Sequence, residues 1–183
     1  YSEIDHLGGK DPYSASKVCA ELVTECFANS FFEKSFLKNK VSTARSGNVI
    51  GGGDYSENRL LPDIIRSINT KKILVIRNPN HIRPWQHVIE PLVGYMKLAE
   101  KQFKSKKLDN YNAWNFGPKK ENFIKVINIV NLLKKRFNFD TKISKKQKFS
   151  ETKILKLSSK KSYRKLKWSN KWDLEKSLNK VME

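Results

Sequence analysis

Two residues suited to catalysis, Tyr13 and Lys17, stand four positions apart in the stretch DPYSASK. On a helix this spacing places both side chains on one face. Asp11 is a preferred N-cap residue and Pro12 a preferred first helical residue, so a helix is predicted to begin there. A phenol acts as a base at neutral pH when a nearby positive charge stabilises its deprotonated form, and an ammonium group supplies such a charge. The spacing also arises by chance on amphipathic helices, so alone it establishes no function.

The elements that must position this pair follow from apolar spacing and from turn residues. Apolar residues that recur every three or four positions predict helices, and short apolar runs bounded by turn residues predict strands. The predicted helices cover residues 12–32, 60–68, 90–103, 123–133 and 173–181, the last capped by Asp173; the predicted strands cover 41–45, 73–76, 114–116 and 154–157; residues 47–54 are a glycine-rich loop, and the rest of 142–167 is loop. A helix followed by a strand predicts an α/β fold.

Charge is distributed unevenly along the chain. The net charge is +19, and residues 101–183 hold 24 basic but only 7 acidic side chains, most of the basic ones lysine. We interpret these as solvated lysine faces and predict no nucleic-acid partner. A basic nucleic-acid binder, or an inactive binding remnant, is the alternative from outside the enzyme classes.

Other residue types exclude several classes of protein. No apolar run is long enough for a membrane span, so no membrane association is predicted. Cys19 and Cys26 lie seven apart on one helix, where we expect them to pack as small apolar residues, and they fit a reducing cytoplasm. His6, His81 and His87 show no spacing typical of metal ligands, so no metal site is predicted.

Four stretches give the chain a family resemblance. In order, they are LGGKDPYSASKVCAEL, RSGNVIGGGD, NPNHIRPWQHVIEPL and WNFGP. Together they resemble the extended short-chain dehydrogenase/reductase family, and within it the nucleotide-sugar 4,6-dehydratases. The resemblance is strong over residues 7–118. It enters the family partway through, and Tyr1 is not a translation start, so we expect a C-terminal fragment that is inactive alone and part of a homo-oligomer when full length.

The resemblance implies a fold and a domain organisation. The fold would be the C-terminal part of a Rossmann-type doubly wound parallel sheet, plus a smaller α/β substrate-binding lobe. Residues 1–50 would complete the NAD-binding domain, and residues 51–183 would form mainly the nucleotide-sugar-binding lobe, interleaved with the remaining Rossmann elements. The glycines at 51–53 lack the spacing of the fingerprint that seats NAD, so we interpret GGGD as a turn beside the substrate.

The resemblance also implies the chemistry. Tyr13 would take the proton of the sugar 4-hydroxyl while the C4 hydride passes to NAD, and Lys17 would hold the nicotinamide ribose. Water would then leave from C5 and C6, and the hydride would return to C6. The acid and base of this elimination would lie on a segment preceding this chain. A nucleotide-sugar epimerase or decarboxylase that uses the same tyrosine and lysine is the alternative within the enzymes.

Five further residues match substrate-binding positions of the family. They are Asn48, Arg59, Arg77, Arg83 and Asn115, of which Arg83 would clamp the diphosphate with its planar fork. The sequence RPWQH, which contains His87, resembles the CDP-glucose branch and implies CDP-glucose as the substrate. Packing of Trp85 and His87 against the neighbouring helix is the structural alternative. The chain departs from the family at Lys167, where a glycine is usual.

Overall fold

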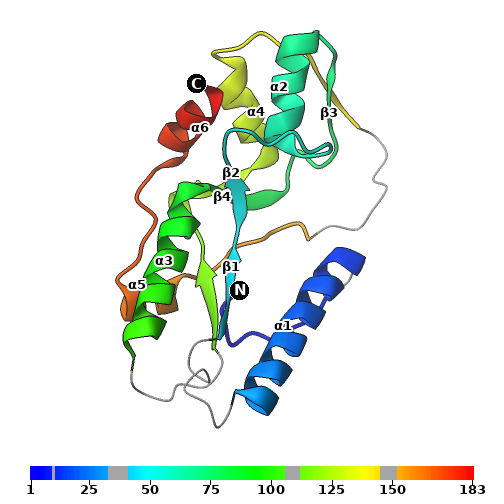
Figure 1. The fold of residues 1–183 in the computed structure, drawn as a ribbon. Helices are drawn as coiled ribbons and strands as arrows, with labels where there is room; N and C mark the ends of the chain where they lie inside the picture. The colour runs from blue at the N-terminus through cyan, green and yellow to red at the C-terminus, as the bar shows by residue number, and fades with distance from the viewer. Residues whose placement is uncertain (10, 33–40, 106–111, 145–151) are drawn as a thin grey trace.

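The computed structural model describes residues 1–9, 11–32, 41–105, 112–144 and 152–183 (Figure 1). Six α-helices, seven short strands and one 3₁₀ turn make up this part of the chain. In order they are α1 (Pro12–Phe31), β1 (Ser42–Ser46), β2 (Asn48–Ile50), α2 (Leu60–Thr70), β3 (Leu74–Ile76), β4 (Ile82–His87), α3 (Ile89–Lys104), β5 (Asn112–Phe116), η2 (Lys120–Asn122), β6 (Phe123–Lys125), α4 (Val126–Lys134), β7 (Thr141–Ile143), α5 (Lys160–Leu166) and α6 (Leu174–Met182). The mixture confirms the predicted α/β class.

Helix α1 begins where the sequence predicts. Asp11 Oδ1 accepts a hydrogen bond from Ser14 N at 3.0 Å, and the Ser14 hydroxyl accepts one from Asp11 N, which together form a capping box ahead of Pro12. Within this helix Ala28 alone is buried. The expectation that Cys19 and Cys26 pack as apolar residues is wrong, because both are exposed on a helix that buries little of its surface.

The chain passes from one sheet to another at Gly47. Strand β1 pairs in parallel with β5, and β2, which follows directly, pairs in parallel with β4. A Cβ atom at Gly47 would lie 2.5 Å from Pro84 Cγ and 2.8 Å from the Pro84 carbonyl oxygen, so the approach to β4 requires glycine. The prediction of a loop at 47–54 is therefore wrong for Asn48–Ile50. Pairing with a distant strand, which local sequence does not encode, makes this segment extended.

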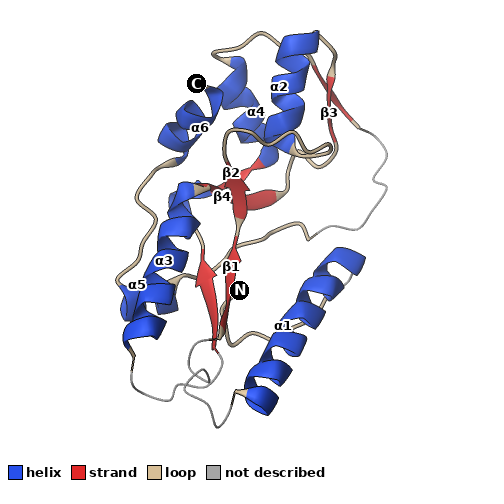
Figure 2. Ribbon diagram, in the orientation of Figure 1, coloured by secondary structure: helices blue, strands red, loops and turns tan. Residues whose placement is uncertain are grey.

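Two clusters of buried apolar residues hold the sheets. The larger lies among β2, β3, β4, α2, α4 and α6, and its members include Ile64, Trp85, Ile129 and Leu178. The smaller lies where α3 and α5 meet β5, and consists of Leu98, Trp114, Phe116, Leu166 and Trp168. Figure 2 shows α1 lying apart from α2, α4 and α6 of the larger cluster and from α3 and α5 of the smaller one. The helix with the candidate base therefore contributes to neither core.

The C-terminal part holds the remaining differences from prediction. Residues 160–166, which were predicted as loop, form α5. The strand predicted at 154–157 is reduced to one bridge between Ile154 and Ile82. The part of the predicted loop at residues 145–151 lies outside the described residues. Phe123–Lys125 is a strand antiparallel to β4, although the sequence predicted the start of a helix there. Asp173 caps α6 as predicted, since its Oδ1 accepts from Lys176 N at 2.7 Å.

Candidate functional site

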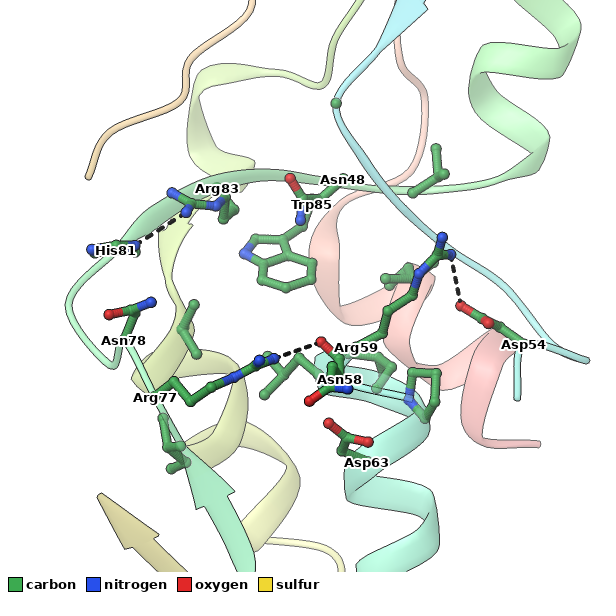
Figure 3. Close-up of a pocket in the computed structure, with 18 of the residues that line it drawn as sticks. Asn48, Asp54, Asn58, Arg59, Asp63, Arg77, Asn78, His81, Arg83 and Trp85 are labelled. Carbon is green, nitrogen blue, oxygen red and sulfur yellow. Dashed lines mark hydrogen bonds and ion pairs between the residues drawn. The ribbon is translucent and has the colours of Figure 1, made fainter. Parts of the chain in front are cut away.

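A cavity of about 640 Å³ lies between the start of α1, the β1–β2 junction, helix α2 and the strands β3 and β4. Five of the seven residues predicted to bind or react line it: Tyr13, Asn48, Arg59, Arg77 and Arg83. In Figure 3 the three arginines surround the hollow, and Trp85 lies among them. Residues spread over seventy positions of sequence are thus collected at one site.

Tyr13 reaches the cavity from the first turn of α1. Its side chain is 72% exposed, so solvent and ligand have access to the phenol. Lys17 does not line the cavity, but its Nζ lies 5.4 Å from the centroid of the Tyr13 ring. The predicted shared face is therefore confirmed, with the ammonium lying over the tyrosine ring.

Arg59 stands at the N-cap position of α2 and is held by the loop before it. Its Nη1 lies 3.2 Å from Asp54 Oδ2. Hydrogen bonds from Ser56 and the neighbouring Arg59 guanidinium hold the pKa of Asp54 below its ordinary value. The carboxylate stays charged at neutral pH and keeps the guanidinium at the cavity (Figure 3).

Arg77 fastens the same loop from the opposite side. Its Nη2 donates to the carbonyl oxygen of Asn58 at 2.7 Å, just past the end of β3. Asn58 adopts a left-handed conformation with φ of 64°, which asparagine tolerates better than most residues. The contact orients a guanidinium into the cavity without using all of its donors.

Arg83 lies on β4 and is bound mainly by carbonyl oxygens. Its Nη1 donates to Thr152 O at 2.8 Å and to Ile82 O at 3.0 Å, and its Nη2 lies 3.1 Å from His81 Nδ1. These contacts hold the guanidinium at the cavity, which Arg83 lines. With three guanidinium groups around it, the cavity is suited to a ligand that carries phosphates.

The two asparagines lie in different places. Asn48 stands opposite Trp85 in the parallel β2–β4 pair and lines the cavity. Asn115 is fully buried in β5, where its backbone N donates to Glu3 Oε1 at 2.9 Å, and it does not line this cavity. The structure therefore does not bring Asn115 together with the other predicted residues, and its substrate-binding role stays a prediction.

Several lining residues were not predicted from the sequence. Asn58, Asp63, Asn78 and His81 add polar groups to the cavity wall, as does Asp54 of the GGGD turn that was interpreted from the sequence as lying beside the substrate. His81 stands just before β4, with its Nδ1 3.1 Å from Arg83 Nη2, but no strand was predicted there and the sequence carried no signal for this contact. The other unpredicted residues lie on loops or on a helix and carried no such signal.

Comparisons with known proteins agree with this geometry. The model of the NAD dependent epimerase/dehydratase family matches residues 1–113. A CDP-glucose 4,6-dehydratase from Salmonella typhimurium is 39% identical over 188 residues, which cover all of this chain and 52% of that protein. The chain belongs to the NAD-dependent epimerase/dehydratase family. It spans about half the length of this relative.

Solved structures show the fold of this epimerase/dehydratase family member. MoeE5 in complex with UDP-glucuronic acid and NAD aligns with a TM-score of 0.83 at 17% identity, over 100% of this chain and 57% of that one. DesIV, a dTDP-glucose 4,6-dehydratase from Streptomyces venezuelae with NAD and TYD bound, aligns with a TM-score of 0.83 at 16% identity, over 99% and 52%. The predicted Rossmann-type α/β fold is thereby confirmed.

Within the described residues, no helix is both long and apolar enough to span a membrane.

Proposed function

We propose that this chain is part of an NAD-dependent nucleotide-sugar 4,6-dehydratase that converts CDP-glucose to CDP-4-keto-6-deoxyglucose. One observation carries the proposal: Tyr13, with Lys17 beside it, opens onto the same cavity as Arg59, Arg77 and Arg83. An alcohol-oxidising base and a phosphate-binding wall are the two parts that such a reaction needs. The 39% identity to a CDP-glucose 4,6-dehydratase supports the choice of sugar nucleotide.

The cavity suits the proposed substrate in size and charge. About 640 Å³ lies within the range of small-molecule sites. Planar guanidinium groups bind phosphate oxygens through paired hydrogen bonds, so the three arginines fit a diphosphate. Arg83 lines the cavity from β4, where contacts with Thr152 O and His81 Nδ1 hold its planar guanidinium, and it is the arginine we assign to the diphosphate clamp. Asn48 would contact the sugar from the β2 side.

Tyr13 and Lys17 also fit the ribose side of NAD. A phenol oxygen and an ammonium on one exposed helix face offer hydrogen bonds to ribose hydroxyls. When bound, NAD supplies the acceptor for the C4 hydride. Lys17 would hold the ribose, and through its charge it would favour the phenolate form of Tyr13.

The first chemical step follows from this placement. Tyr13 Oη takes the proton of the sugar 4-hydroxyl as C4 is oxidised to a ketone. The ketone acidifies the C5 proton, so that water can be lost across C5 and C6; addition of a hydride at C6 and of a proton at C5 would then complete the reaction without net redox change. In this scheme Tyr13 holds the transferred proton, and the arginines keep the nucleotide fixed.

The proposal extends to the setting of the enzyme. Residues 1–50 would belong to the NAD-binding domain and residues 51–183 mainly to the nucleotide-sugar lobe. We further propose that the protein works in the cytoplasm, where NAD and sugar nucleotides occur, and that it forms a homo-oligomer. Size-exclusion chromatography with light scattering on the complete protein tests the last point.

Product analysis tests the function. The complete protein that contains this chain is incubated with NAD and, separately, with CDP-, UDP- and dTDP-glucose, and the products are identified by NMR. A 4-keto-6-deoxy sugar, formed fastest from CDP-glucose, is the expected result. A C4 epimer, or no product from any of the three, would overturn the dehydratase assignment, and faster turnover of UDP- or dTDP-glucose would overturn the choice of CDP-glucose.

A further inference from the structure

Helix α1 is fastened to the sheet by an ion pair. Arg45 of β1 donates from Nε and from Nη2 to the two carboxylate oxygens of Glu21, which lies in the middle of the helix. The hydroxyl of Thr43, also on β1, donates to Glu21 Oε2 at 3.5 Å. Two parallel hydrogen bonds between a guanidinium and a carboxylate fix direction as well as distance. The contact therefore defines how α1 lies against β1.

Burial makes this pair stronger than an ordinary surface contact. The side chain of Arg45 is 22% exposed and that of Glu21 15% exposed, so water screens the charges only in part. Apolar packing on α1 is slight by comparison, because Ala28 is the one buried residue of the helix. Leu22, Val23 and Phe27 are all more than half exposed. Among the described residues of this chain, the ion pair is therefore the best-defined side-chain contact between α1 and β1.

Both the helix that carries Glu21 and the strand that carries Arg45 also carry or lead into residues that line the cavity. Tyr13, Lys17 and Glu21 follow one another at intervals of four residues, so they form one stripe along the helix. A rotation or slide of α1 that breaks the Glu21 contact also moves the Tyr13 phenol. On the strand side, Ser46, Gly47 and Asn48 follow Arg45 directly and line the cavity.

We propose that the Glu21–Arg45 pair is a positioning pair that sets the location of the Tyr13 phenol relative to the cavity. The inference rests on the proposed role of Tyr13 as base. Neither partner lines the cavity, so neither acts on the substrate directly. Because the arginines of the cavity lie at the start of α2, just past β3 and on β4, loss of the pair affects the position of Tyr13 and leaves nucleotide binding in place.

Steady-state kinetics on the complete protein with NAD and CDP-glucose tests this role. Glu21→Gln and Arg45→Leu are each expected to lower kcat by about 10- to 100-fold, since misplacement of a reacting group by about 1 Å has effects of that order. KM for CDP-glucose is expected to change less than about threefold. The charge-swapped double variant Glu21→Arg with Arg45→Glu is expected to recover part of the lost kcat. Glu25→Gln, one turn further along the same exposed helix, is the matched control and should keep wild-type kcat.

Three results separate this proposal from its alternatives. Unchanged kcat in Glu21→Gln would overturn it. Equal losses in kcat and in nucleotide affinity, with no recovery in the charge swap, would also overturn it, because they would mark a general structural role. If Tyr13→Phe keeps normal turnover, the proposed function fails; if Tyr13→Phe is inactive while Glu21→Gln is normal, only the positioning role fails.

Discussion

Helix α1 and the arginine-bearing region around α2, β3 and β4 meet at one cavity but are held in place differently. The arginine-bearing region rests on the larger apolar core, in which Ile64, Ile129 and Val130 are fully buried. Helix α1 buries one residue and relies on the polar contact between Glu21 and Arg45. In this chain the proposed base therefore lies on a helix held mainly by polar contacts, while the arginines proposed to bind phosphate lie beside a packed apolar core.

This difference predicts which substitutions should change stability and which should change turnover. Apolar burial contributes most of the free energy of unfolding, so the packed region should govern stability. Changes on α1 should leave stability nearly unchanged and act on turnover.

Replacement of the proposed base should separate activity from stability most clearly. Tyr13→Phe removes one oxygen from a side chain that is 72% exposed, so the melting temperature should stay within about 1 °C of wild type. Loss of the proton acceptor should lower kcat by about 10²- to 10⁴-fold with little change in KM. Tyr163→Phe, at an exposed tyrosine of α5, is the matched control and should keep full activity. Normal kcat in Tyr13→Phe would refute the proposed chemistry.

Truncation of an apolar side chain should lower the free energy of unfolding much more in the larger core than on α1. Ile64→Ala leaves a cavity in the larger core and should lower the free energy of unfolding by about 2–5 kcal/mol. Leu22→Ala on α1 removes the same kind of side chain from a position that is 52% exposed, and should cost less than about 1 kcal/mol. Urea denaturation followed by circular dichroism measures both. Similar losses for the two variants would show that α1 is packed as firmly as the core.

Loss of the planar fork of Arg83 should weaken binding at the packed end. Lysine keeps the charge but cannot form paired hydrogen bonds with a diphosphate, so Arg83→Lys should raise KM for CDP-glucose about tenfold, which corresponds to about 1.4 kcal/mol. kcat should change little, because Tyr13 is untouched. Arg136→Lys, at an exposed arginine that does not line the cavity, should leave both constants unchanged. A fall in kcat alone would contradict the division of labour between the two ends.

Local sequence signals predicted the helices better than the strands. Asp11 and Asp173 cap α1 and α6 where expected, because a cap depends on neighbouring residues alone. Asn48–Ile50 and Phe123–Lys125 become strands only through pairing with β4, which no local pattern encodes. Lys167 ends α5 with φ of 51°, a conformation that favours glycine, and this gives a physical reason for the family's usual glycine there.

The candidate site could be predicted in its residues but not in its contacts. Motifs in a fixed order pointed to Tyr13, Arg59, Arg77 and Arg83, and the cavity contains all four. Their partners, such as the Asn58 carbonyl for Arg77, could not be predicted, because they depend on how a loop folds back. Asn115 also matched a motif of the family, but it does not line this cavity.

The smallest expected effect concerns pH and the packed region. Burial lowers the pKa of His87 from its ordinary value of 6.5, an effect that the charge of Glu90 partly offsets. As pH falls through 6.5, the unfolded chain therefore binds a proton at this residue before the folded protein does. The free energy of unfolding should decline between pH 7 and pH 5, and the decline should level off below the pKa of the folded protein. His87→Gln should make this slope shallower in urea titrations, whereas His6→Gln, at an exposed histidine, should not. An identical slope in wild type and His87→Gln would contradict this assignment, because it would show that contact with the Trp172 ring, tilted by 44° with centroids 4.9 Å apart, does not oppose protonation of His87.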